Sequence, residues 1–391
     1  MQDWDLTDEQ RMIRQNIREF AEAEIRPRAR ELDKRAEFAP DLARQMGELG
    51  LFGMTVPEEY GGAGMDTKSY IIAVEELARV DGSQAVTVAA GNSLGINPLY
   101  YFGSEEQKKK YLPELCRGPR HLFGFGLTEP GSGSDAAGAR TMAYPDGDDF
   151  VINGSKIFIT NAGTELTIGT IVMCKLSDRD RSEASRGGRP VYVCILVENG
   201  TPGYTIRKME DKMLWKASNT CELYFDDVRV PKANLLGGVG DGFKIMLRIL
   251  DGGRLSIAAM GLGAAQGAFE IALRYAQGRE QFGQPIARFQ GVAFKLADMA
   301  TEIEHARAFL YRTCDMRDKG LPHTRESAMT KLACGELAGR VTDAAMQVLG
   351  GYSVMPDYEV ERYWRDQRIL QIGEGTSEIQ RLIIARTLGC Q

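Results

Sequence analysis

One carboxylate near the end of the chain, Glu374, stands between Gly373 and Gly375, directly before a predicted helix. The two glycines remove side-chain bulk from both sides of the carboxylate, so a substrate and the backbone could approach it closely. Ser377 and Gln380 have the spacing of a capping box, which places the start of the helix here. A carboxylate in this setting suits a general base. The local pattern alone favours the other interpretation, a solvated glutamate in a helix-entry turn, and leaves the general base open.

A glycine-rich loop over residues 126–136 concentrates backbone N–H donors and hydroxyl groups. Such loops can hold a phosphate or lie along a planar ring. Gly131, Gly133 and Ala136 match the loose dinucleotide fingerprint, but no βαβ unit surrounds them. We therefore reject a nicotinamide site at this loop.

Two further segments carry groups that could contact a cofactor. Residues 156–161 predict a strand on which Phe158 and Thr160 point the same way, so that a ring and a hydroxyl could cover a flavin. Arg279 lies close to Phe282, a pair equipped for pyrophosphate and adenine contact. Each segment also has an ordinary interpretation in isolation, as a half-buried strand and as a loop between helices.

The predicted elements divide the chain into three domains. Residues 1–122 are helical, with a capping box at Thr7 and Gln10 and helices over 69–79 and 83–94. Residues 123–233 alternate short β-rich runs with turns, including a polar loop over 177–189, and contain no intervening helices, which favours an antiparallel β domain. Residues 234–391 return to helical periodicity, with long helices over 255–277, 289–319 and 325–349 that predict a four-helix-type bundle. The fold class is therefore α+β and predominantly helical.

Composition argues against several functional classes. The net charge of −6 and the absence of a basic stripe argue against nucleic acid as a partner. No run approaches the ~20 apolar residues of a membrane span, and the acidic first residues resemble neither a signal nor a transit peptide. Seven scattered cysteines indicate a reducing compartment, and the three histidines have no metal-binding spacing. We expect a cytoplasmic protein of bacterial type or a processed mitochondrial matrix protein, without a metal.

Taken together, the chain resembles the acyl-CoA dehydrogenase family along essentially its whole length. Residues 127–136, 158–161, 251–254, 279–283, 347–351 and 374–376 occur in the family's order and at its spacing. The resemblance implies a homotetramer with one FAD per subunit. It implies that Glu374 removes the α-proton of an acyl-CoA thioester while the β-hydrogen leaves as hydride to flavin N5. Electrons would then pass to an electron-transfer flavoprotein.

The resemblance also implies roles for individual residues. The set that would bind FAD is Phe125, Leu127, Thr128, Gly133, Ser134, Phe158, Ile159, Thr160, Arg279, Gln281, Phe282, Gln290, Gln347, Gly351, Thr376 and Glu378. Its members from Arg279 to Gly351 would partly reach a neighbouring subunit. The set that would bind the CoA thioester is Ser134, Asp251, Arg254, Gly375 and Arg386.

Three positions depart from the family pattern. Phe158 stands where many relatives carry Trp, and Trp215 stands where smaller residues are common, with no role that we can assign. Gly373 stands where many relatives have a bulky residue, often Tyr. Its small size should widen the acyl cavity, which favours a branched, cyclic or aryl-substituted acyl group; the resemblance as a whole is to the short-chain, branched or cyclic acyl-CoA type. The predicted pocket floor, residues 87–99, contains no Arg or Lys, which weakens a dicarboxylyl substrate.

Two alternative functions belong to other classes. An acyl-CoA oxidase would share the motifs but would usually be longer. A catalytically inactive flavin-binding relative that holds nucleic acid would need a basic surface, which the charge balance does not provide.

Overall fold

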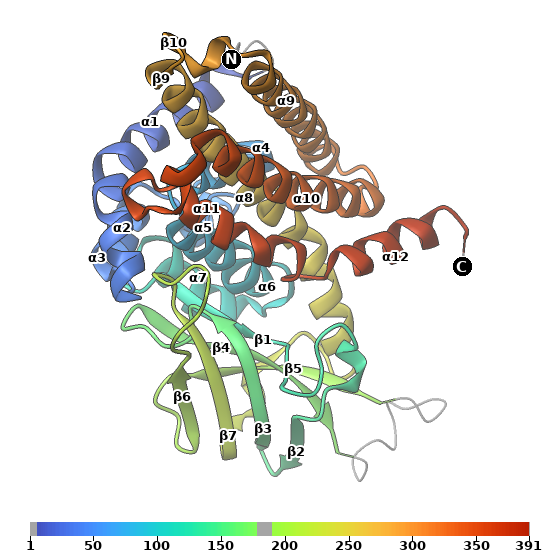
Figure 1. Cartoon of the computed structure of the whole chain (residues 1–391). Helices are drawn as coiled ribbons and strands as arrows, with labels where there is room; N and C mark the ends of the chain where they lie inside the picture. Colours follow the sequence, from blue (N-terminus) through green and yellow to red (C-terminus); the bar gives the residue numbers. More distant parts are fainter. Residues whose placement is uncertain (1–5, 178–189, 391) are drawn as a thin grey trace.

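The computed structural model describes residues 6–177 and 190–390, and its elements follow the predicted order of helices, strands and helices (Figure 1). The predicted capping box at the first helix is confirmed, because Thr7 and Gln10 exchange side chain to backbone hydrogen bonds of 3.2 Å. The N-terminal helices are α1 Asp8–Phe20, α2 Arg26–Arg35, α3 Pro40–Glu48, α4 Thr67–Ala78, α5 Gly82–Ala90, α6 Asn97–Phe102 and α7 Glu105–Arg117. Segments of π-helix, Ala21–Ile25 and Gly91–Ile96, join α1 to α2 and α5 to α6.

The strands form a sheet in the order β6-β7-β3-β2-β4-β5-β8, with β1 also paired to β4. Their bounds are β1 Leu122–Gly126, β2 Met142–Asp146, β3 Asp149–Thr160, β4 Thr167–Leu176, β5 Tyr192–Glu198, β6 Tyr204–Lys208, β7 Thr220–Pro231 and β8 Leu235–Leu236. Most pairs are antiparallel, as predicted. The pairs of β4 with β1 and with β2 are parallel, which the sequence did not predict. Parallel neighbours need a long crossover, and the loop and hairpin between β1 and β4 supply it. The predicted polar loop over 177–189 lies outside the described residues apart from Ser177.

The C-terminal helices are α8 Gly242–Gly278, α9 Gln290–Asp318, α10 Thr324–Leu349, α11 Val360–Asp366 and α12 Ser377–Thr387. A small hairpin of β9 Glu280–Gln281 and β10 Gln284–Pro285 separates α8 from α9. Helix α8 begins earlier than predicted and includes Gly252 and Gly253, although glycine disfavours helices. Packing within the core outweighs that preference.

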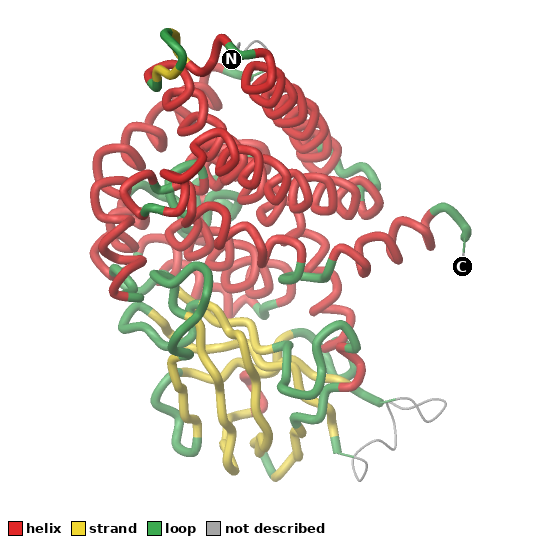
Figure 2. Tube along the Cα trace, in the orientation of Figure 1, coloured by secondary structure: helices red, strands yellow, loops and turns green. Residues whose placement is uncertain are grey.

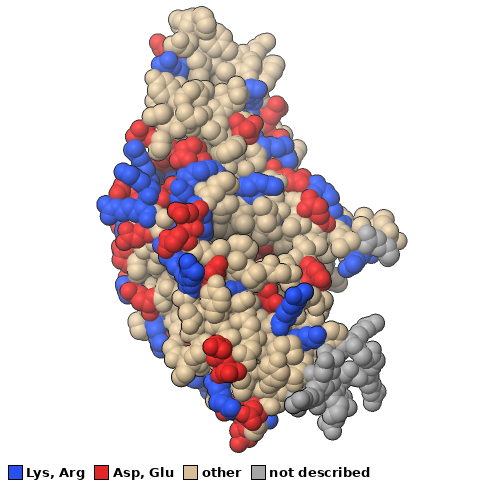
Figure 3. Space-filling view, turned by 60° about the horizontal axis from the view of Figure 1, so that its bottom comes forward, with Lys and Arg blue, Asp and Glu red and all other residues tan. Residues whose placement is uncertain are grey.

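Helix α8 is the central helix of the fold. By length and composition alone it could cross a membrane, with a mean hydropathy of 1.3 over its most apolar window, but 83% of that window is buried inside the protein. Figure 2 shows the helices gathered above the sheet, with α12 leading away from them toward the C-terminus. Acidic and basic side chains are interspersed over the face shown in Figure 3.

Candidate active site

Glu374 lies in the turn between a short 3-10 helix, Gln367–Gln371, and α12. Glu374 and Gly375 both have left-handed backbones, with φ of 52° and 95°. Thr376 caps α12, because its Oγ1 accepts a hydrogen bond from the backbone N–H of Ile379 at 3.2 Å. The predicted capping box of Ser377 and Gln380 is therefore wrong by one residue. The side-chain amide of Gln380 donates instead to the Gly375 carbonyl at 2.9 Å, which fixes the turn that carries the carboxylate.

The carboxylate of Glu374 lies directly against α8. A Cβ added at Gly253 would be 2.1 Å from Glu374 Oε2, so only a glycine at that position leaves room for the carboxylate. Oε2 is buried and, among the described residues, has no hydrogen-bond partner. An unpartnered buried carboxylate oxygen costs free energy, and a catalytic role is one reason for a protein to retain it.

Two buried cations flank this carboxylate. Arg254 on α8 pairs with Asp251, and Lys331 on α10 donates to the Gly375 carbonyl at 2.6 Å. Burial raises the pKa of Glu374 to about 7, and the charges of Lys331 and Arg254 oppose that rise. Burial likewise lowers the pKa of Lys331 to about 8, against the effect of Glu374. A carboxylate with a pKa near neutrality and a free oxygen can accept a proton at physiological pH.

The glycine-rich loop is fixed to the sheet by a buried ion pair. Lys156 on β3 donates to Glu129 Oε1 at 2.8 Å and to the Leu127 carbonyl at 3.1 Å. Burial acts to raise the pKa of Glu129, but Lys156 and the backbone donors of Arg140 and Thr141 outweigh it and lower that pKa. Neither partner was among the candidate residues, and a lysine in a strand that also contains Asp149, Asn153 and Ser155 gave no clear sequence signal.

The predicted flavin-facing residues of the β domain are only partly accessible. Phe125 is buried on β1, Leu127 and Thr128 are half-buried, and Gly133 and Ser134 are exposed. On β3, Ile159 is buried in the sheet core, Thr160 is half-buried and the ring of Phe158 is 61% exposed. A bulge with a φ of 62° at Phe158, rather than simple alternation, turns this ring outward.

The predicted diphosphate and adenosine residues lie on the β9–β10 hairpin and near the end of α10, far from the sheet (Figure 1). The Arg279 guanidinium carbon is 5.7 Å from the ring centroid of Tyr352, and the ring of Phe282 is 94% exposed. Gln281, Gln290, Gln347 and Gly351 are also exposed. One chain therefore does not bring these residues together with Thr128 and Phe158.

The remaining candidates lie around the base turn and along α12. Thr376 and Glu378 begin α12, and Asp251 pairs with Arg254 beside the carboxylate. Arg386 is exposed near the end of α12, which extends away from Glu374 (Figure 1). Within residues 6–177 and 190–390, no group of His, Cys, Asp and Glu side chains is arranged to hold a metal ion.

Three family models match successive parts of the chain: the N-terminal domain of acyl-CoA dehydrogenase over residues 7–119, its middle domain over 124–228 and its C-terminal domain over 240–389. The probable acyl-CoA dehydrogenase YngJ of Bacillus subtilis is 48% identical over 98% of this chain and 99% of its own length. The chain belongs to the acyl-CoA dehydrogenase family. The short-chain specific acyl-CoA dehydrogenase of Clostridium acetobutylicum is 44% identical over 98% of each chain.

Solved structures share the fold of this acyl-CoA dehydrogenase. Butyryl-CoA dehydrogenase from Megasphaera elsdenii has a TM-score of 0.93 and 40% identity, covering 99% of this chain and 100% of that chain. The acyl-CoA dehydrogenase of Bacillus anthracis complexed with FAD has a TM-score of 0.91 and 36% identity. The match covers 100% of this chain and 68% of that chain. A chain in a structure described as the electron transferring flavoprotein of Acidaminococcus fermentans has a TM-score of 0.93 and 43% identity, covering 99% of both. The predicted enzyme class, an oxidoreductase, is confirmed.

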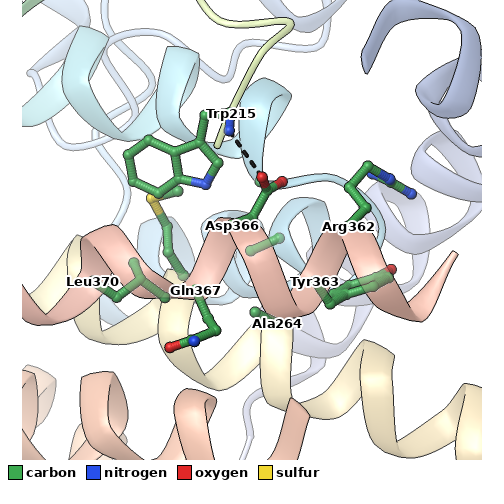
Figure 4. A pocket seen from close by; sticks show the side chains of 10 residues that line it. Trp215, Ala264, Arg362, Tyr363, Asp366, Gln367 and Leu370 are labelled. Carbon is green, nitrogen blue, oxygen red and sulfur yellow. Dashed lines mark hydrogen bonds between the residues drawn. The ribbon is translucent and has the colours of Figure 1, made fainter. Parts of the chain in front are cut away.

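In this acyl-CoA dehydrogenase, Trp215 follows β6 in the chain and lies beside Asp366, the last residue of α11 (Figure 4). Its backbone N–H donates to Asp366 Oδ1 at 2.8 Å, and its φ of 43° is left-handed. Gly82 leaves room for the indole, because a Cβ there would be 2.5 Å from Nε1. Burial and the charge of Asp81 raise the pKa of Asp366 to about 7. The structure thus gives Trp215, to which the sequence assigned no role, a hydrogen-bond partner in Asp366.

Proposed function

We propose that this enzyme catalyses the FAD-dependent α,β-dehydrogenation of a short acyl-CoA thioester to the 2-enoyl-CoA, with Glu374 as the general base. The observation that carries the proposal is the buried, unpartnered Oε2 of Glu374, whose pKa is raised to about 7. Such an oxygen is free to accept a proton and has a suitable basicity near neutral pH. The names of the relatives, short-chain specific and butyryl-CoA dehydrogenase, support the substrate class.

FAD is the cofactor, and the donor set of the chain fits it. The rings of Phe158 and Phe282 are exposed, and both residues have left-handed backbone; an exposed aromatic ring can stack on a planar partner. The Thr128 hydroxyl and the Arg279 guanidinium add a hydrogen-bonding group and a pyrophosphate-binding cation. The other residues of the proposed FAD set are those that the family resemblance implied. When bound, FAD supplies the acceptor for the β-hydride of the substrate.

The residues around the base have separate tasks in the reaction. Glu374 Oε2 takes the α-proton, and Gly253 leaves the space that the carboxylate needs. The backbone N–H of Glu374 is proposed to donate to the thioester oxygen, where negative charge develops. Arg254 and Lys331 stabilise the ionised carboxylate before the proton moves. General-base catalysis of this kind contributes about 10²–10⁴-fold to the rate.

The small residue beside the base supports a compact acyl group with room near its reacting carbons. A Cβ at Gly373 would be 3.5 Å from the Ile369 carbonyl oxygen, an ordinary contact, so a side chain could stand there and glycine leaves that space open. The proposed floor of the pocket, residues 87–99, runs from α5 to α6 and contains no Arg or Lys. We propose short straight or branched acyl groups rather than dicarboxylyl groups.

The same reasoning supports a homotetramer that passes electrons to an electron-transfer flavoprotein. The β9–β10 hairpin beside Arg279 and the sheet lie at opposite ends of the chain (Figure 1), which supports an FAD site completed by a second copy. A groove of about 510 Å³ between α9 and α10, lined by Phe309, Met329 and Leu332 among others, offers an apolar face for such a copy. A native mass of one chain would contradict this proposal.

Glu374→Gln tests the proposed function. Gln is nearly isosteric with Glu but cannot accept the proton. FAD content and butyryl-CoA binding should therefore persist. Flavin reduction should slow at least by the contribution of a general base, which is about 10²–10⁴-fold. The measurement is anaerobic stopped-flow of flavin absorbance. Glu106→Gln, an exposed carboxylate on α7, is the matched control. A Glu374→Gln enzyme that reduces its flavin within tenfold of the wild-type rate would show that another group is the base.

A further inference from the structure

Buried and half-buried lysines in this protein differ in how well their charges are satisfied. The buried Lys156 has two oxygen acceptors, including the carboxylate of Glu129, and the half-buried Lys212 donates to four oxygens. Lys331 is 1% exposed and donates to one oxygen, the Gly375 carbonyl at 2.6 Å. Lys156 forms an ion pair with Glu129 at 2.8 Å, whereas within the described ranges 6–177 and 190–390 Lys331 forms no ion pair. An ammonium buried with so few partners is unfavourable in itself, so its position calls for a functional explanation.

Holding the turn does not by itself require a charge at position 331. The side-chain amide of Gln380 already donates to the same Gly375 carbonyl at 2.9 Å. A neutral donor on α10 would therefore satisfy the carbonyl as well, without the desolvation penalty of an ammonium. What lysine adds at this position is a positive charge beside the base turn.

The charged groups that act on Lys331 come from three elements. Glu374 precedes α12 and Glu378 lies in its first turn, and both favour the protonated lysine. Arg254, from α8, opposes them. The carboxylate of Glu374 is therefore placed between the cations of α8 and α10, and neither cation occupies Oε2.

We propose that Lys331 is a positioning residue for the base: it fixes the turn through the Gly375 carbonyl, and its charge keeps Glu374 ionised while leaving Oε2 free for the α-proton. A direct ion pair would also favour the ionised form, but it would engage the oxygen that has to accept the proton. The inference rests on the proposed role of Glu374 as the base and adds a second residue that sets its working pH range.

Three substitutions separate the charge from the hydrogen bond. Lys331→Gln keeps an N–H donor without charge, Lys331→Met removes both, and Lys331→Arg keeps both. Loss of a nearby opposite charge should raise the pKa of Glu374 by about one unit. The ionised fraction of Glu374 at pH 7 would then fall from about one half to about one eleventh, so flavin reduction with butyryl-CoA in Lys331→Gln should slow about fivefold at pH 7 and recover at higher pH. Lys331→Met should show the same pH shift and a lower rate at high pH, and Lys331→Arg should restore the wild-type midpoint.

A second measurement does not depend on turnover. Infrared difference spectra of the FAD-loaded protein across pH should show the carboxyl band of protonated Glu374, assigned by its absence in Glu374→Gln. That band should titrate at higher pH in Lys331→Gln than in the wild type. Lys212→Met is the control, because it removes a half-buried lysine whose ammonium contacts the Trp215 loop, and it should leave the midpoint unchanged.

The two proposals fail in different ways. If Glu374→Gln reduces its flavin normally, the role of Glu374 is wrong, whatever Lys331 does. If Glu374→Gln is inactive but Lys331→Gln keeps the wild-type pH midpoint in both rate and infrared titration, the role of Lys331 is wrong. Loss of FAD or of helical structure in Lys331→Met would be checked by absorbance and circular dichroism, and the Gln and Arg variants then decide the question.

Discussion

Gly253→Ala should displace the proposed base while leaving the fold intact. A Cβ at this position would be 2.1 Å from Glu374 Oε2, whereas ordinary contacts begin at 3.4 Å, so the carboxylate has to move by about 1.3 Å. Oε2 is the end of a flexible side chain, and α8 gains about 1 kcal/mol of helix propensity from the change. The carboxylate should therefore give way and the backbone should stay. A misplacement of about 1 Å in a catalytic group can reduce the rate about 10²-fold.

The assay is anaerobic flavin reduction by butyryl-CoA, with FAD content and thermal unfolding measured on the same preparation. Gly252→Ala is the matched control, because it makes the same helix-favouring change one residue away. Its Cβ would meet the guanidinium of Arg317 at 3.0 Å instead of the carboxylate. We expect a loss of about 10²-fold for Gly253→Ala and under threefold for the control. Equal rates in the two variants would refute the argument that Gly253 makes room for the base.

Three further predictions concern the cofactor, the substrate and stability. Arg279→Ala should weaken FAD retention by about one to two orders of magnitude, because charge-assisted bonds of about 1.5–3 kcal/mol are lost; an unchanged FAD dissociation constant in dialysis would contradict this. Gly373→Tyr should reduce kcat/KM for branched acyl-CoA more than for straight short ones, since overpacking costs about 1–3 kcal/mol; equal losses across a substrate panel would disprove the open space. Asp366 has its pKa raised from 3.8 to about 7, so the folded state loses stability as pH rises through that window. Asp366→Asn keeps an oxygen acceptor for Trp215 and should stabilise the protein by up to about 4 kcal/mol at pH 8 but not at pH 4, as measured by urea unfolding.

Local sequence was sufficient to predict most of the elements and to mark Glu374 as a candidate, whereas its role as the base came from the family resemblance. Glycines beside Glu374, the Thr7 capping box and the helical periods of α9 and α10 are short-range patterns, and short-range patterns determine where elements begin and end. The start of α8 was missed for the same reason. Gly252 and Gly253 look like a helix break locally, and only contact with Glu374 explains why a glycine stands inside the helix.

The rest of the site depends on contacts between residues far apart in the chain. The Trp215 N–H bond to Asp366 spans 151 residues, and the Lys331 bond to Gly375 spans 44. No periodicity indicates that a lysine on α10 will be buried, or that a tryptophan will adopt a left-handed backbone to reach a carboxylate. The parallel pairing of β1 with β4 was unpredictable for the same reason, since it is set by a crossover and not by either strand.

The environment of Glu374 balances two requirements that oppose each other. Burial raises its pKa from 4.5 to about 7, so the folded protein loses up to about 3 kcal/mol of stability as pH rises across that window. A direct ion pair would recover that stability, but it would lower the basicity of the carboxylate and engage its free oxygen. Arg254 and Lys331 lie beside the carboxylate without bonding to Oε2, and Gly253 lets α8 approach it. Glu374 therefore stays ionisable, and its Oε2 has no partner among the described residues. The protein is locally less stable where the proposed chemistry requires it. By contrast, Lys156 and Glu129 form a direct buried ion pair, and their role is to fix the glycine-rich loop to the sheet.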